Sequence, residues 1–282
     1  MNKRYIFTVC AGRSGQSSFT HLLQNSVPNC HVAFEAPHAN VRFEGRLGNW
    51  ERRFHRRFIE TNELLGRGRV LTAFENSDEE YLARIARKRL DLIHRDMVQS
   101  GNNIYFDVSK FYARGLHVGF DRILDSYSLV LLVRDPVKNM RSFLNRNKNF
   151  FLDNNQPDSA SNILRMDTAS LAKGELYLWA WCELYLRFLE MANRTEVDKS
   201  IILRTSNLEN ADCMAKSLDE LELGHGPVVT TSPRNTNKSL GFEATKESEE
   251  DIRLFTGFLD KLPTDLRKSI DYFDDYVPGH PA

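Results

Sequence analysis

The chain has 282 residues, of which 41% are hydrophobic and 27% are charged, so it is long enough to bury a substantial core. Lys and Arg together number 38, as do Asp and Glu, and the formal net charge is zero. This balance provides no global field that would attract nucleic acid or an anionic membrane. The length and composition predict a single α/β domain over residues 1–282.

The chain begins with a buried strand over 5–9 and a helix over 17–24, joined by the sequence Cys-Ala-Gly-Arg-Ser-Gly-Gln-Ser-Ser at 10–18. A strand that leads through a glycine turn into a helix leaves free N–H groups and a positive dipole end facing an anion. Arg13 adds a planar guanidinium that can hold a phosphate or sulfate through two hydrogen bonds. The predicted anion-binding residues of this loop are Gly12, Arg13, Ser14, Gly15, Gln16, Ser17 and Ser18.

This loop differs from the nucleoside-triphosphate P-loop, whose pattern is G-x-x-x-x-G-K-[ST]. Gly12 and Gly15 stand too close together for that pattern, and no Lys follows Gly15. No acidic second motif for Mg²⁺ stands out along the chain. These departures disfavour a metal-assisted kinase or GTPase and predict a site without metal.

A short strand over 31–34 ends in Glu35-Ala-Pro-His38, and an amphipathic helix is predicted between 46 and 65. Residues 42–57 carry six Arg against two Glu. This cluster is either a solvated helix face or a rim that attracts an anionic cofactor or an acidic acceptor. A long helix from Ser77 to about 99 follows, because Ser77 and Glu80 have the form of a capping box.

The remaining strands are predicted over 104–108, 129–133 and 200–203, with helical patterns between them. Crossover connections of this kind imply a mostly parallel sheet of about five strands between two helical layers. Arg134-Asp-Pro follows the strand over 129–133, and Ser142 lies on the next helix, about 120 residues after the first motif. Both motifs therefore fall at carboxyl ends of strands, where ligands bind in such sheets.

The last third of the chain holds an aromatic-rich helix over 175–193, a long loop over 224–241 and two closing helices. The aromatic side chains are either core or the wall of an acceptor pocket. The four Cys are dispersed without metal-type spacing, which fits a reducing compartment. The first apolar run is too short for a signal peptide or a membrane span, so a cytoplasmic, bacterial protein is expected.

At these residues the chain resembles the sulfotransferases that use 3′-phosphoadenosine-5′-phosphosulfate (PAPS), closest in motif style to the carbohydrate type. Arg13-Ser-Gly-Gln-Ser17 is similar to their 5′-phosphosulfate loop, although Gln16 replaces the usual Thr. Arg134-Asp-Pro with Ser142 is similar to their 3′-phosphate motif. Thr236-Asn237-Lys238-Ser239 is a weaker likeness to the late loop that closes over the nucleotide. The resemblance implies PAPS as donor, 3′,5′-diphosphoadenosine (PAP) as product, no metal, and a glycan or small-molecule acceptor with a hydroxyl.

Sulfuryl transfer needs a base near the acceptor, and Glu35 is the first candidate because it ends the strand beside the phosphosulfate loop. Its other interpretation is a structural, Arg-paired carboxylate. His38 is the second candidate, since its ordinary pKa suits base work, and Asp107 is a third. Lys110 resembles a lysine that neutralises the departing phosphate in heparan-type enzymes, and otherwise is a surface lysine.

Three other functions remain open from the sequence. One is a P-loop kinase with an altered loop, which would bind ATP with Mg²⁺. The second is a non-catalytic protein that binds PAP or PAPS without turnover. The third is a nucleic-acid binder built on the Arg-rich helix, which the zero net charge disfavours. The oligomeric state is not encoded in any of these patterns.

Overall fold

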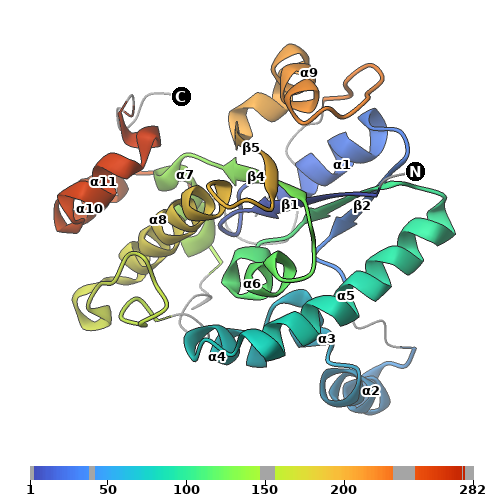
Figure 1. The fold of residues 1–282 in the computed structure, drawn as a ribbon. Helices are drawn as coiled ribbons and strands as arrows, with labels where there is room; N and C mark the ends of the chain where they lie inside the picture. The colour runs from blue at the N-terminus through green and yellow to red at the C-terminus, as the bar shows by residue number, and fades with distance from the viewer. Residues whose placement is uncertain (1–2, 38–41, 147–155, 231–244, 275, 277–282) are drawn as a thin grey trace.

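The sheet of the computed structural model is fully parallel and has five strands within the described residues, which are 3–37, 42–146, 156–230, 245–274 and 276 (Figure 1). The strand order is β2-β3-β1-β4-β5. The strands are β1 (Arg4–Val9), β2 (Cys30–Phe34), β3 (Ile104–Val108), β4 (Tyr127–Val133) and β5 (Val197–Arg204). The α/β class and the parallel sheet predicted from the sequence are confirmed.

The central strands are apolar along their whole length because both faces of the sheet are covered. All seven residues of β4 are buried. Alternate positions point into two separate cores, as the period of two in a strand requires. Phe7 and Leu129 lie in the core on one face, whereas Ile6 and Val130 lie in the core on the other.

Two helical layers enclose the sheet (Figure 1). Helices α1 (Gln16–Ser26) and α9 (Ala211–Glu220) supply residues to one core, and α5 (Glu79–Ser100), α6 (Leu116–Asp121) and α8 (Lys173–Ala192) supply the other. The remaining α-helices of the described residues are α2 (Gly45–Phe58), α3 (Thr61–Leu65), α4 (Arg69–Glu75), α7 (Pro136–Leu144), α10 (Glu249–Lys261) and α11 (Thr264–Ser269).

Two details of the predicted helices are wrong. The cap of α5 is Asp78, whose side chain accepts a hydrogen bond from the Tyr81 N–H at 3.1 Å, while Ser77 has a left-handed backbone with φ 54°. The single helix predicted between 46 and 65 is two helices, α2 and α3. They are separated at Glu60, which has φ 53° and pairs with Lys88 of α5.

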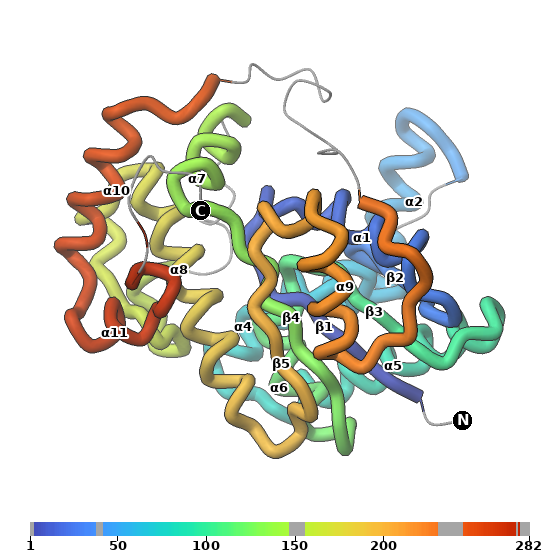
Figure 2. The backbone as a smooth tube through the Cα atoms, turned by 90° about the horizontal axis from the view of Figure 1, so that it is seen from above, coloured from blue at the N-terminus to red at the C-terminus, as the bar shows by residue number. Residues whose placement is uncertain are grey.

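The helices that follow the adjacent strands β1 and β4 lie on opposite faces of the sheet. The chain passes from β1 into α1 on one face, and from β4 into α7 on the other. Such a switch point opens a crevice at the carboxyl ends of the strands, where ligands bind in open α/β sheets. Figure 2 shows α7 and α2 on the side of the molecule opposite the N-terminal residues of β1, which is this carboxyl-end side.

Helix α10 fixes α7 above that crevice. Arg141 of α7 donates from Nε to Asp251 Oδ2 of α10 at 2.8 Å, and Asp251 is 3% exposed. Asp251 also completes a capping box with Ser248 at the start of α10. The Thr245 carbonyl accepts from Asn145 Nδ2 at 3.0 Å, just beyond the end of α7. The two predicted closing helices, α10 and α11, are confirmed.

Candidate functional site

The loop between β1 and α1 turns sharply because its last residue is glycine. Gly15 has φ 84°, and a Cβ there would lie 2.8 Å from Thr205 Cγ2 and 3.3 Å from Leu208 Cδ1. Both the backbone conformation and the space therefore require glycine. The Thr205 hydroxyl lies 2.9 Å from the Ser14 carbonyl and 3.0 Å from the Val133 carbonyl, which ties the loop to the end of β4.

The Arg134-Asp-Pro motif forms the junction between β4 and α7. Asp135 is the N-cap, accepting from the Lys138 N–H at 2.8 Å, and Pro136 is the first helical residue, where its missing N–H has no cost. Trp181 of α8 donates from Nε1 to the Arg134 carbonyl at 3.0 Å. These contacts therefore fix the backbone that carries the Arg134 side chain at the end of β4.

The two predicted motifs lie against each other. Arg134 Nη1 donates to the Arg13 carbonyl at 3.2 Å, and Arg13 Nε donates to Ser142 Oγ at 3.3 Å. Arg13 has a left-handed backbone with φ 72°, a conformation that non-glycine residues adopt mainly where the surroundings impose it. A ligand bound by one motif is therefore within reach of the other.

The site is electropositive. Burial, followed by the nearby charges of Arg146 and Arg134, lowers the pKa of Arg13 to about 10. The guanidinium stays protonated at neutral pH, so three cations are held close together. A bound dianion removes their mutual repulsion, which makes this edge of the sheet suited to phosphate or sulfate groups.

Two buried side chains, whose contact with the loop no sequence pattern predicts, shape its backbone. Tyr177 of α8 donates its hydroxyl to the Gly12 carbonyl. The Asn139 amide of α7 faces the Gly12 and Arg13 carbonyls at 3.2 and 3.0 Å, so its nitrogen is the donor on that side. The one available signal for Asn139 is its position three residues before Ser142, on the same face of a helix.

Gln16, the residue that departs from the sulfotransferase pattern, is the first residue of α1 and is 7% exposed. Its Nε2 is buried and finds no hydrogen-bond partner among the described residues. A buried amide without a partner costs free energy, so Nε2 is a candidate hydrogen-bond donor to an anion in the loop. Ser17 is half-buried and Ser18 is 6% exposed in the same first turn.

Glu35 and Lys110 form an ion pair beside the loop. Lys110 Nζ donates to Glu35 Oε1, and the Lys110 and Glu35 side chains are 14% and 20% exposed. A Cβ on Gly12 would lie 3.5 Å from Lys110 Cδ, so the pair borders the anion loop. Burial lowers the pKa of Lys110, and Glu35 partly opposes that shift. Glu35 has φ 45°, so the backbone turns sharply just after the end of β2.

Asp107 is in a different environment from Glu35. It is 1% exposed in β3 and pairs with the buried Arg89 of α5. Burial raises its pKa, while Arg89 opposes the rise. An acceptor cannot reach this carboxylate, which fits a structural role. The predicted residues His38, Asn237 and Lys238 lie outside the described residues.

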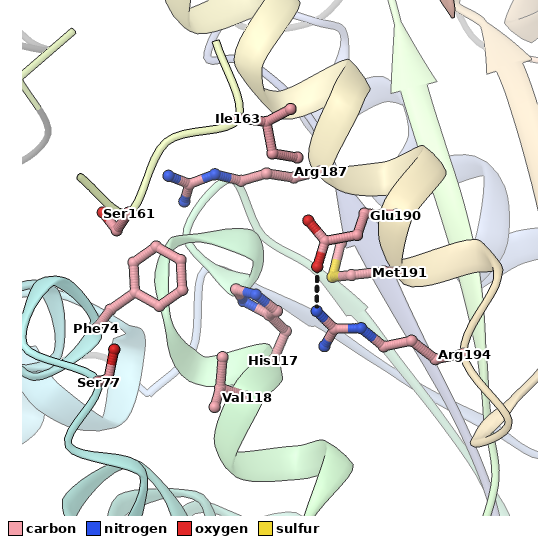
Figure 3. A pocket seen from close by; sticks show the side chains of 10 residues that line it. All are labelled: Phe74, Ser77, His117, Val118, Ser161, Ile163, Arg187, Glu190, Met191 and Arg194. Atoms are coloured by element: carbon pink, nitrogen blue, oxygen red, sulfur yellow. Dashed lines mark hydrogen bonds and ion pairs between the residues drawn. The ribbon is translucent and has the colours of Figure 1, made fainter. Parts of the chain in front are cut away.

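A separate cavity of about 240 Å³ lies between α4, α6 and the distal half of α8 (Figure 3). Its charged side chains are paired: Arg187 with Glu183, and Arg194 with Glu190 and Asp121. About ten residues of α8, or roughly 15 Å, separate it from Tyr177 at the anion loop. This cavity is therefore distinct from the electropositive site and has no excess of cations.

The described residues contain no group of His, Cys, Asp and Glu that could hold a metal ion. No helix in the described ranges is both long and apolar enough to cross a membrane. The four Cys are free thiols.

Comparison with known proteins gives a match at the level of structure. No family model matches the sequence, and no curated protein matches it. The sulfotransferase domain from the curacin biosynthetic pathway is 11% identical, with a TM-score of 0.50 over 98% of this chain and 99% of that chain. The sulfotransferase domain from the Synechococcus PCC 7002 olefin synthase is 16% identical, with a TM-score of 0.44 over 93% and 97%.

The chain therefore has the fold of sulfotransferase domains, as the sequence motifs predicted. The likeness extends over the whole architecture of the domain.

Proposed function

We propose that the protein transfers a sulfuryl group from PAPS to a hydroxyl of a carbohydrate or natural-product acceptor. The observation that carries this proposal is the convergence of two anion motifs, in which Arg13 contacts Ser142 and Arg134 contacts the Arg13 carbonyl. A nucleotide donor with phosphate on both the 3′ and the 5′ position of its ribose fits two adjoining cationic subsites. The sulfotransferase-domain fold supports the same choice.

The donor subsites follow from the two loops. The 5′-phosphosulfate is assigned to the turn from Gly12 to Ser18, where Arg13 and the buried Gln16 Nε2 offer donors. The 3′-phosphate is assigned to Arg134 and Ser142. Asn237 and Lys238 remain predicted contacts to the nucleotide, on the resemblance alone. No metal is required, because arginine and backbone donors supply the positive charge.

The reaction is an in-line displacement at sulfur. The acceptor oxygen forms a bond to sulfur while the bond between sulfur and the 5′-phosphate oxygen breaks, and PAP leaves with that electron pair. Glu35 takes the acceptor proton, and Lys110 neutralises the charge that develops on the leaving phosphate. Positioning and preorganised donors supply most of the rate, and the base contributes on the order of 10²–10⁴-fold.

Calorimetric titration with PAP tests the donor assignment. ADP and 5′-AMP serve as controls, and no metal is added. Tight binding that depends on the 3′-phosphate supports both subsites and justifies an acceptor screen with PAPS. Equal or absent binding of all three nucleotides removes the sulfotransferase proposal, and ATP binding that requires Mg²⁺ points to a kinase instead.

A second candidate is a non-catalytic PAP- or PAPS-binding protein. The observation that favours it is the Glu35–Lys110 ion pair, which occupies the proposed base in the free protein. This candidate predicts tight PAP binding with no turnover of [³⁵S]PAPS on any acceptor. Turnover with one acceptor removes it. A cytoplasmic location remains a prediction from the sequence.

A further inference from the structure

Helix α2 turns its apolar side chains outward. Leu47, Trp50, Phe54 and Phe58 recur along one face and are 63%, 65%, 41% and 67% exposed. Their rings pack on one another, with centroids 5.9 Å apart for Trp50 and Phe54 and 4.9 Å apart for Phe54 and Phe58. This apolar face of α2 is a continuous stripe, whereas exposed apolar residues on a monomer surface are ordinarily scattered.

The covered side of α2 is a narrow polar one. Gly48 is its one buried residue, and a Cβ there would lie 2.2 Å from the Phe43 carbonyl oxygen. Glu51 accepts from the backbone N–H groups of Arg42 and Phe43 at 2.7 and 3.3 Å. The narrow polar side of the helix therefore faces its own leading segment, and the apolar face is left over.

The rest of the helix surface is cationic. The 14 residues of α2 include five Arg against one Glu, a net charge of +4 on a helix about 21 Å long. At 100° per residue, Arg52 and Arg56 lie opposite the aromatic stripe, and Arg46, Arg53 and Arg57 lie along its flank. All five are exposed.

We propose that α2 seats the protein on an anionic lipid surface, with the apolar face in the headgroup region and the flanking Arg46, Arg53 and Arg57 on lipid phosphates. A surface helix with aromatic and Leu residues on one face and Arg on the other has the pattern of an interfacial helix. A second copy of the chain fits less well, because two α2 helices would bring like charges together. A nucleic acid would pair the arginines and leave the apolar stripe in water.

Helix α2 lies close to the candidate site. Only ten residues separate the end of β2 at Phe34 from the start of α2 at Gly45, and Glu35 lies in that interval. Figure 2 shows α2 on the carboxyl-end side of the sheet. A lipid-bound α2 therefore holds the crevice near the interface.

Tryptophan fluorescence can detect this binding directly, because Trp50 is the exposed one of three tryptophans. Trp179 and Trp181 are 1% and 3% exposed, so a shift of the emission maximum on adding vesicles reports on Trp50. The full chain is titrated with vesicles containing 30 mol% phosphatidylglycerol in phosphatidylcholine, and with phosphatidylcholine alone. A blue shift and co-sedimentation with the anionic vesicles, weakened by added salt, are the expected results.

Paired variants test the two faces separately. Phe54→Ser with Phe58→Ser abolishes co-sedimentation, and Arg53→Gln with Arg57→Gln weakens it about 25-fold, at about fivefold per arginine. The matched control is Arg87→Gln with Arg95→Gln on the exposed face of α5, which leaves it unchanged. All the substituted side chains are exposed, so the variants are expected to fold.

Absent binding to anionic vesicles overturns the proposal. So does binding that survives both α2 double variants. If the parent chain does not bind vesicles but forms a concentration-dependent dimer, and the Phe54 and Phe58 variant is monomeric, the face is assigned to a second copy. Salt-sensitive binding to an oligonucleotide alone assigns the arginines to nucleic acid.

Discussion

Arg13 Nε donates to Ser142 Oγ at 3.3 Å, joining two sequence motifs that lie 129 residues apart. The contact depends on two elements with separate supports: the glycine turn after β1, and α7, which Arg141 anchors to α10. The two supports share no residue, so each subsite can be substituted on its own. The predictions for the two phosphate groups can therefore be separated by experiment.

Arg134→Ala is expected to weaken PAP binding about 10- to 150-fold, because it removes a charged donor to the 3′-phosphate. Binding of adenosine 5′-phosphosulfate, which lacks that phosphate, changes little. Arg13→Ala abolishes turnover and weakens the binding of both nucleotides. Calorimetry of each variant measures the difference. Arg122→Ala, which removes a surface arginine paired with Glu79, is the control and leaves affinity unchanged. An Arg134→Ala variant that binds PAP as tightly as the parent contradicts the assignment.

Gly15→Ala is expected to destabilise the fold by about 1–3 kcal/mol, since a Cβ meets Thr205 Cγ2 at 2.8 Å and φ is 84°. Adding Thr205→Ser removes that methyl group but keeps the hydroxyl that bonds the loop. The double variant recovers part of the loss, because the backbone strain remains. Urea unfolding of the two single variants and the double variant gives the coupling energy. Strict additivity would show that the contact is relieved elsewhere.

Glu35→Gln is expected to lower turnover about 10²–10⁴-fold with nearly unchanged PAP affinity, because it removes the proposed base and keeps the side-chain shape. Glu60→Gln is a closely matched control. Glu60 is also paired with a lysine, is 19% exposed against 20% for Glu35, and has φ 53° against 45°. Steady-state kinetics on both variants separates base chemistry from loss of an ion pair. Parent-like turnover of the Glu35 variant moves the role to His38.

The Arg141–Asp251 pair predicts a pH dependence of stability. Burial acts to raise the pKa of Asp251, but the hydrogen bonds from Arg141 and Ser248 lower it overall. A depressed carboxyl pKa stabilises the fold above the unfolded pKa of about 4, and this contribution is lost as pH falls through the folded value. Arg141→Met therefore costs about 2–3 kcal/mol at pH 7 and less near pH 3. Denaturant unfolding at both pH values measures this, and a gap that does not narrow contradicts it.

The sheet is predictable from the sequence because its signals are local. Buried strands such as β4 are apolar on every residue, and the Arg134-Asp-Pro junction carries its own cap and first helical residue. The motif residues Arg13 and Ser142 are predictable for the same reason, since local patterns mark where strands end and helices begin. Their mutual contact follows from parallel strands ending at one edge.

What the sequence did not predict depends on packing between distant segments. Tyr177 and Asn139 reach the Gly12 carbonyl from two helices whose placement no local pattern encodes. The spacing of Trp50 and Phe54 predicted an amphipathic helix, but periodicity identifies an apolar face without saying whether it points inward. Here the exposed fractions of Leu47, Trp50 and Phe58, which are 63%, 65% and 67%, show that it points to solvent.

Gln16→Met is expected to change stability and affinity in opposite directions. Gln16 Nε2 is buried without a partner among the described residues, so an apolar side chain of similar length relieves a desolvation cost of about 1 kcal/mol in the free protein. The same change removes a donor to the bound phosphosulfate, which weakens PAPS binding about tenfold. Thermal unfolding of the free protein measures the stability, and titration with the nucleotide measures the affinity.

Gln24→Met, at an exposed position of the same helix, is the matched control for Gln16→Met, and it should alter neither quantity. A Gln16→Met variant that is stabilised yet binds PAPS like the parent would show that Nε2 does not contact the donor. In that case the residue is a tolerated replacement for threonine. Higher stability together with lower affinity instead identifies the glutamine as a donor-binding residue, whose amide costs the free protein stability until a ligand satisfies it.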